Sequence, residues 1–270
     1  MRGYLVLSWF LGVILLQAMP SFLIAQAYPG VPLAPNGPSH EVRALVPPAQ
    51  GPPLREAPLP GLPPNETLAT QRVLDILDFW FGLLPGPGFF PEDKLSIWLA
   101  GTPETDRQIR DYFSQDIINA ERGDYNSWRE FPRGRLALIL LLDQFPRHIY
   151  RNSPQEFLLD RMARVLVLEG IRKGDDKRLY PIERAFFYLP LEHAEDLDLQ
   201  DLSVALYRQL VAESPPSIRL PMQGFLQSAI IHQQQIEHFG RFPYRNGILG
   251  RESTPEETVF LIQWGRPKNS

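Results

Sequence analysis

From Asn65 to the C-terminus, apolar side chains recur at helical spacing. The first stripe repeats at positions i, i+3, i+4, i+7 and i+8, and it consists of Val73, Ile76, Leu77, Trp80 and Phe81. This spacing predicts an amphipathic helix, which Gly82 is expected to end. A second helix is predicted to begin at Thr102 and Pro103 and to end at Gly123.

The stretch 136–142 is apolar on every side, which predicts a helix in the centre of the domain. Pro146 is expected to stop or kink it, because proline removes a helical hydrogen bond. Residues 153–156 form a capping-box pattern with Pro154 at the first helical position, and this pattern predicts a helix that reaches about Arg172.

Four further helices are predicted along the rest of the chain. They are expected to begin at Pro181, to span 198–212, to span 225–239 with an end at Gly240, and to follow a second capping box at 254–257. No alternating pattern typical of strands occurs beside them. The predicted fold class is therefore all-α, with antiparallel helix pairs joined by turns that proline and glycine mark.

Residues 1–27 have the pattern of a signal peptide. Arg2 precedes an apolar run over 4–18, and Ala25-Gln26-Ala27 supplies the small residues that precede a cleavage site. We therefore expect export, either to the periplasm or to the medium. An uncleaved membrane anchor is the alternative, because the run 4–25 is just long enough to span a bilayer.

Residues 28–65 contain twelve prolines and no apolar periodicity. Such a composition favours extended polyproline conformation and predicts a semi-rigid linker. A proline-recognition ligand is the alternative interpretation. Residues 66–270 then form one domain of ordinary size.

Charge and cysteine content exclude several classes of protein. The formal net charge is −4, and it becomes −5 once Arg2 is removed with the signal peptide. No basic stripe indicates nucleic-acid binding, and no membrane association is expected beyond the export signal. Because the chain has no cysteine, it has neither disulfides nor a thiol nucleophile.

Three stretches, 131–147, 181–195 and 240–246, set charged residues directly against large apolar ones. Each unpaired charge there would cost several kcal/mol, so we expect one paired constellation. The candidate catalytic residues are Glu192, His193, Glu195 and His232. The candidate ligand-binding residues are Asp143, Arg147, Arg151, Glu183, Arg184, Arg241, Arg245 and Asn246.

The spacing of these residues admits two interpretations. Asp143 precedes Arg147 and Arg151 by about one and two helical turns, which suits carboxylate–guanidinium pairing. A converging set of carboxylates, imidazoles and guanidiniums suits acid–base chemistry or the capture of an anion. Alternatively, the Arg–Glu pairs clamp helix ends and the histidines are core residues.

No motif for a metal or cofactor occurs. The spacings of zinc proteases and di-iron bundles are missing, so no metal and no cofactor is expected. His193 and Glu195 with a distant His232 could still assemble a divalent site. The nucleophile elbow, the Walker loop and the dinucleotide fingerprint are also missing.

Long motifs at 132–147, 183–193 and 239–246 give the chain a family resemblance. From Arg72 to about Leu261 it is similar to the family called domain of unknown function 924, which is mainly bacterial. The resemblance implies a tetratricopeptide-like helical array and no established reaction. Tyr244 stands where the family usually has His, and Ala194 where it usually has Ser.

Two functional hypotheses follow. The first is a helical-array module that binds a protein or peptide partner, or a small anionic ligand. The second is a hydrolase or acid–base enzyme that uses the candidate catalytic residues, with Arg147 and Arg241 holding an anionic substrate.

The N-terminal pattern yields a first prediction. We expect the mature chain to begin at Tyr28, because the small residues at Ala25 and Ala27 flank the cleavage position. N-terminal sequencing of the exported protein checks this. A sequence that begins at Met1 or Arg2 would show that the segment is retained.

Overall fold

The computed structural model describes residues 68–263, and every regular element in that range is helical. The all-α prediction is confirmed. Helix α4 (Leu68–Phe81) and helix α5 (Pro103–Arg122) fall where the apolar stripes placed them. Gly82 and Gly123 follow them with φ of 66° and 84°, a left-handed conformation that favours glycine. The predicted signal peptide and the predicted Pro-rich linker lie outside the described residues.

The central apolar stretch forms a nearly continuous helix. It consists of α6 (Pro132–Ile139), a π-helical turn η5 (Leu140–Gln144) and α7 (Phe145–Ile149). All residues from 136 to 142 are buried, which confirms their central position. Pro146 was expected to end or kink this helix. It does not end the helix, because it lies in the first turn of α7, directly after the π turn.

The capping box predicted at 153–156 does not form. Ser153 Oγ accepts the N–H of Gln155, while Glu156 Oε2 accepts the N–H of Asn152 instead of that of Ser153. The reciprocal pair of bonds is therefore missing, and only a 3₁₀ turn, η6 (Pro154–Phe157), results. Helix α8 (Asp160–Lys173) begins after it.

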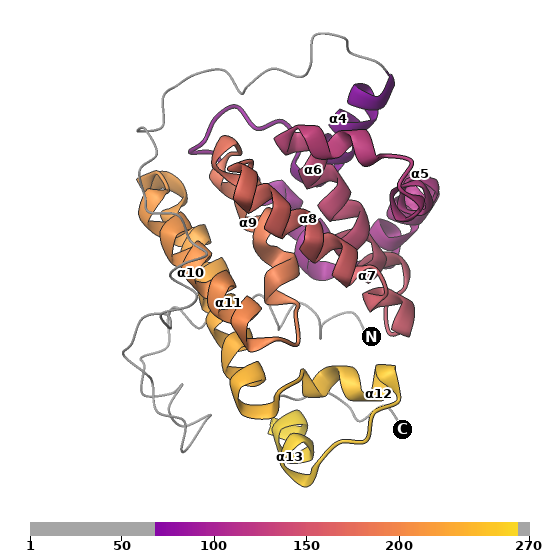
Figure 1. Ribbon diagram of the computed structural model, residues 1–270, viewed down its shortest axis with the longest axis vertical. Helices are drawn as coiled ribbons and strands as arrows, with labels where there is room; N and C mark the ends of the chain where they lie inside the picture. The colour runs from indigo at the N-terminus through magenta and orange to yellow at the C-terminus, as the bar shows by residue number, and fades with distance from the viewer. Residues whose placement is uncertain (1–67, 264–270) are drawn as a thin grey trace.

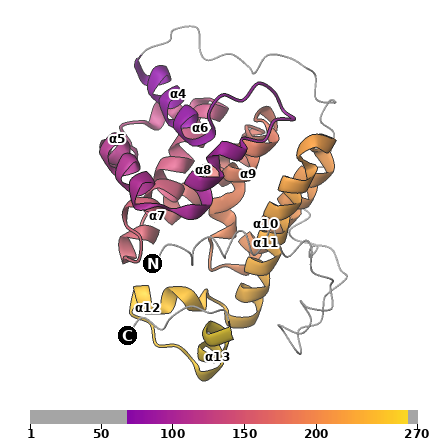
Figure 2. The same ribbon diagram turned by 180° about the vertical axis from the view of Figure 1, so that it is seen from behind.

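Helix α9 (Pro181–Glu192) is buried along its whole length. It packs closely on α8 at Gly170, where a Cβ atom would lie 2.5 Å from the Phe187 ring. Helices α10 (Leu197–Glu213) and α11 (Arg219–Phe239) form an antiparallel pair along one edge of the molecule (Figures 1 and 2). Helix α11 begins six residues earlier than predicted, because Pro221 falls in its first turn, where no intrahelical N–H bond is needed.

Gly240 ends α11 with a φ of 68°, as predicted. The chain then forms η9 (Pro243–Arg245), α12 (Asn246–Leu249) and α13 (Pro255–Gln263), which lie beyond the end of α11 in both views (Figures 1 and 2). The capping box at Thr254 is present, with Thr254 and Glu257 each accepting the other's N–H. The remaining short turns are η2 (Glu92–Lys94), η3 (Ser96–Ala100), η4 (Asn126–Glu130), η7 (Asp176–Arg178) and η8 (Pro216–Ile218).

The core is aromatic at its centre. The Trp80 ring lies 5.5 Å from the Phe145 ring and 5.6 Å from the Phe186 ring, measured between centroids. These contacts join α4, α7 and α9. Of the helices between residues 68 and 263, none has the length and hydropathy needed to cross a bilayer.

The burial of the central helix yields a second prediction. Leu140 is 0% exposed, so Leu140→Asp should abolish folding, because a buried unpaired carboxylate costs a large share of the total stability. Leu158→Asp is the matched control, since Leu158 is 70% exposed, and it should change the melting temperature little. Deletion of residues 28–61 should also leave the melting temperature of the domain almost unchanged. Thermal losses as large as that of Leu140→Asp in either control would contradict the assignment of core and linker.

Candidate functional site

The predicted single constellation does not form, and apart from Arg151 its residues lie in two separate groups. One group surrounds the N-terminal end of α9, at Glu183 and Arg184, and the other surrounds its C-terminal end, at Glu192 and His193. Glu183 and Glu192 are nine residues apart, which places them about 14 Å from each other along the helix axis. The two groups therefore cannot act on one small ligand.

The group at the N-terminal end of α9 is fully paired. Glu183 accepts from Arg133 at 3.1 Å and from the N–H of Tyr180 at 2.8 Å. Burial raises the pKa of Glu183, and Arg133 opposes that rise. Arg184 forms an ion pair with Glu213 at 2.8 Å. These contacts fit the interpretation that charged pairs clamp the end of the helix.

The sequence spacing suggested that Arg151 pairs with Asp143, but Arg151 has a different partner. Its Nη2 lies 2.9 Å from Oδ1 of Asp106, an oxygen that His148 Nδ1 also approaches at 2.9 Å. Asp106 belongs to the first turn of α5, and Arg151 follows the end of α7. The pair thus joins α5 to the end of α7.

Glu192 and His232 meet inside the protein. Glu192 Oε1 accepts from Ser228 Oγ at 2.6 Å and lies 2.5 Å from His232 Nδ1. All three residues are buried. This arrangement agrees with a core histidine, because its imidazole has a carboxylate partner and an edge contact with the Phe242 ring.

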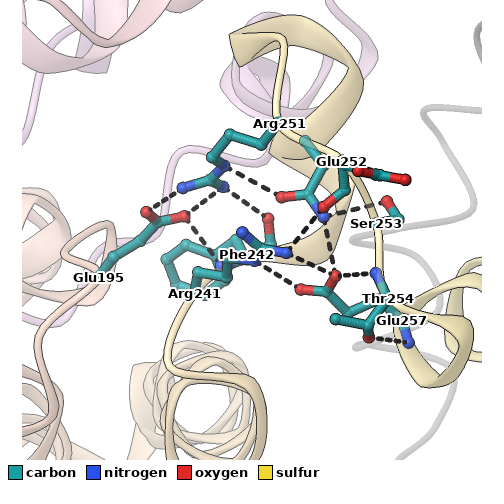
Figure 3. A network of polar contacts seen from close by, with 9 residues as sticks. Glu195, Arg241, Phe242, Arg251, Glu252, Ser253, Thr254 and Glu257 are labelled. Atoms are coloured by element: carbon teal, nitrogen blue, oxygen red, sulfur yellow. Dashed lines mark hydrogen bonds and ion pairs between the residues drawn. The ribbon is translucent and has the colours of Figure 1, made fainter.

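Glu195 belongs to an ion-pair network that fixes the C-terminal segment (Figure 3). Its carboxylate accepts two hydrogen bonds from Arg251, at 2.6 and 2.8 Å, and a third from the N–H of Phe242 at 2.9 Å. Arg241 likewise donates two bonds to Glu257, at 2.6 and 2.8 Å. These bonds hold the pKa of Glu257 at about 2. Bidentate pairs of this kind fix geometry strongly.

Asn246 joins the same network. Its Nδ2 donates to Ser253 Oγ at 3.0 Å and to Glu257 Oε2 at 3.2 Å. Nε and Nη2 of Arg241 and the amide nitrogen of Asn246 therefore donate to the protein itself. These contacts fit a structural role for both residues.

His193 and Asp143 form the one carboxylate–imidazole pair of the candidate residues that reaches the surface. His193 Nδ1 lies 2.9 Å from Asp143 Oδ1, and the imidazole side chain is 15% exposed while the Asp143 side chain is 0% exposed. His193 Nε2 has no hydrogen bond to any residue within 68–263. Asp143 also pairs with Arg147 at 3.2 Å, and Arg147 pairs with Asp160 at 3.0 Å.

The electrostatics of this pair follow from burial. Burial and the charge of Arg147 lower the pKa of His193, and Asp143 opposes that change. Burial works against ionisation of Asp143, yet Arg147 and His193 hold its pKa well below the usual value. The favoured state is thus an ionised Asp143 beside a neutral imidazole, whose unpartnered nitrogen is free to accept a proton.

Arg245 lies next to this pair and has no ion-pair partner within residues 68–263. The residue is 5% exposed. Its Nη2 donates to the backbone oxygen of His193 at 3.0 Å, and its Nε is buried without a hydrogen bond. The guanidinium carbon lies 4.5 Å from the Phe242 ring centre and 4.6 Å from that of Phe157.

Phe157 connects the two arginines. Its ring centre lies 4.6 Å from the guanidinium carbon of Arg245 and 5.9 Å from that of Arg147. Asp143, Arg147, His193 and Arg245 therefore form one compact group, which we call the His193 site. It draws on all three polar stretches of the sequence.

Several members of these groups were not predicted from the sequence. Ser228 precedes His232 by four residues on α11, so helical spacing could have indicated it. Phe157 lies in the segment that was wrongly predicted as α-helix. Asp160 and Arg251 stand in no motif, and only the tertiary structure brings them to their partners.

The possible divalent site at His193, Glu195 and His232 does not assemble, because each side chain has a different partner. Within the described range, no three His, Cys, Asp or Glu residues are grouped so as to hold a metal ion. A surface pocket between η4 and α8 is lined by none of the candidate residues. Its lining consists of Asn126, Arg129, Glu130, Glu169, Arg172 and Lys173.

The comparisons with known proteins agree with an all-α domain whose role is not established. The model of a family described as bacterial protein of unknown function, DUF924, matches residues 76–265, and the chain belongs to this family. A solved structure of the protein of unknown function ATU0120 from Agrobacterium tumefaciens is similar, with 36% sequence identity and a TM-score of 0.61. The match covers 72% of this chain and 98% of that one. No curated protein matches the chain.

The contrast between Glu195 and His193 yields a third prediction. Glu195→Gln should cost about 2 kcal/mol of unfolding free energy, because it weakens three hydrogen bonds to a carboxylate. His193→Gln should change stability little, because Asp143 keeps Arg147 as its partner. Chemical denaturation measures both.

Glu104→Gln is the control for the loss of a carboxylate. Glu104 pairs with Arg107 on the surface, where both side chains are 62% exposed, so its loss should stay within about 0.5 kcal/mol. Equal, large losses in the Glu195 and His193 variants would mean that both residues are internal clamps.

Proposed function

We propose that this domain binds a small anionic ligand, with a carboxylate or phosphate-like group, at the His193 site. The observation that carries the proposal is that the buried guanidinium of Arg245 has no carboxylate partner among the described residues. The other arginines of the candidate set have carboxylate partners, as the buried Arg184 has in Glu213 and the half-buried Arg147 has in Asp143. Arg245 is buried as deeply as Arg184 and has no such partner among the described residues.

An unpaired buried guanidinium is unfavourable for the protein alone. Its desolvation costs several kcal/mol, and aromatic contacts offset roughly 0.5–2 kcal/mol each. Groups held against their electrostatic preference are a common property of binding and catalytic sites. A bound anion would supply the missing partner of Arg245.

The surroundings of Arg245 restrict how an anion could approach. Phe157 and Phe242 pack on the guanidinium, whose N–H groups all lie in its plane. Nη2 already donates a hydrogen bond to the backbone oxygen of His193. The ligand therefore meets the edge of the guanidinium, and one buried group of this size favours a small anion over an extended peptide.

A second candidate function is proton transfer to or from the bound ligand. The hydrogen bond between Asp143 and His193 favours it, because a carboxylate that orients an imidazole through Nδ1 leaves Nε2 available as a general base. In that case the chain is an acid–base enzyme or hydrolase. We further propose that it acts outside the cytoplasm, on the strength of its N-terminal sequence.

The fourth prediction tests the role of Arg245 against a buried arginine that is paired. Arg245→Gln should weaken the binding of sulfate at least tenfold and leave stability unchanged or higher, because it removes an unpaired charge. Arg184→Gln should cost about 2 kcal/mol, because it removes a charge-assisted bond from a buried guanidinium to Glu213, whose side chain is 34% exposed, and should keep the sulfate affinity of the wild type. Isothermal titration of the full-length chain at constant ionic strength measures affinity, and urea denaturation measures stability.

Two results would contradict the proposal. The first is equal sulfate affinity in wild type and in Arg245→Gln. The second is a loss of stability in Arg245→Gln as large as that in Arg184→Gln when no ligand is present, since that loss would make Arg245 a structural clamp.

A further inference from the structure

His193 contacts both charged partners of the His193 site through different atoms. Its ring Nδ1 lies against the carboxylate of Asp143, and its backbone oxygen accepts from the guanidinium of Arg245. An anion on Arg245 would therefore lie next to the residue whose Nε2 has no partner in the described part of the chain.

Charged groups from four elements surround His193. Asp143 of η5, Arg147 of α7 and Asp160 of α8 act on the imidazole, and Arg245 of η9 contacts the backbone oxygen of the same residue. Two carboxylates and two guanidiniums therefore surround His193, and the protonation of the imidazole responds to any further charge. Glu156 of η6 is the further carboxylate near Arg147 and Arg245, whereas Glu192 pairs with His232 and Glu195 with Arg251.

We propose that anion binding at the His193 site is coupled to the uptake of one proton by His193, so that the ligand lies between a guanidinium and an imidazolium. The inference rests on the proposed function and specifies it. The proton comes from solvent and bonds to Nε2, while Nδ1–H continues to donate its hydrogen bond to the carboxylate of Asp143. The new Nε2–H then donates to the anion, in a charge-assisted hydrogen bond.

The direction of the pH dependence follows. In the free protein, burial and Arg147 keep the pKa of His193 below its ordinary value, and a bound negative charge raises it. Between the pKa of the free protein and that of the complex, affinity should fall about tenfold for each unit of rising pH. The ligands that this site selects therefore bind best in mildly acidic solution.

Glu156 is the other group able to take the proton. Burial raises the pKa of its carboxyl group, and the charges of Arg147 and Arg245 oppose the rise. Within residues 68–263 its carboxylate accepts one hydrogen bond, from the N–H of Asn152. The experiment must therefore separate His193 from Glu156.

The fifth prediction uses sulfate, whose own charge is constant at neutral pH. Isothermal titration of the full-length chain in buffers of different ionisation enthalpy should show uptake of up to one proton per sulfate. His193→Gln should still bind sulfate through Arg245, more weakly and with a heat that is independent of the buffer. Glu156→Gln should keep the proton uptake of the wild type.

Three other outcomes would contradict the proposed proton uptake by His193. Saturable binding of sulfate without proton uptake in the wild type would overturn this inference and leave the proposed function standing. Uptake that persists in His193→Gln and disappears in Glu156→Gln would assign the proton to Glu156 and also overturn it. No saturable binding of sulfate at any pH would overturn the proposed function, and the inference with it.

Discussion

Helix α9 is buried along its whole length, so each charged residue on it must find a partner inside the protein. At one end, Glu183 pairs with Arg133 of α6, and Arg184 pairs with Glu213 of α10. At the other end, Glu192 contacts His232 of α11. The neighbouring helices therefore pack around α9 in positions that electrostatics as well as apolar contact determine.

The turn that follows α9 applies the same constraint to residues far apart in the sequence. His193 meets Asp143, fifty positions earlier, and Glu195 meets Arg251, more than fifty positions later. Two bidentate pairs fix the segment after Gly240 (Figure 3). That segment is thereby held in the position where Arg245 touches His193. The rigid clamps and the unpaired arginine are thus parts of one arrangement, in which the clamps keep an unfavourable charge in place.

Much of the fold could be predicted from the sequence, because apolar spacing and end signals are local. The stripe that ends at Gly82 and the stretch 136–142 both appear where expected. Pro146 misled the prediction, since a π turn before it removed the conflict with the helix. The site could be predicted only as a set of residues. Pairing is a tertiary property, and sequence alone could not tell that Arg241 has a carboxylate partner while Arg245, four residues later, has none among the described residues.

The π turn at Leu140–Gln144 has a consequence for the relatives of this chain. It holds one residue more than an α-helical turn would, and each residue rotates a helix by about 100°. Without that residue the chain from Phe145 onward would turn by about 100° relative to α6, so Phe145 would leave its contact with Trp80 while Arg147 turned away from Asp160. A homologue with a one-residue gap at this point would therefore have to change its core packing and its His193 site together, however closely its remaining residues align.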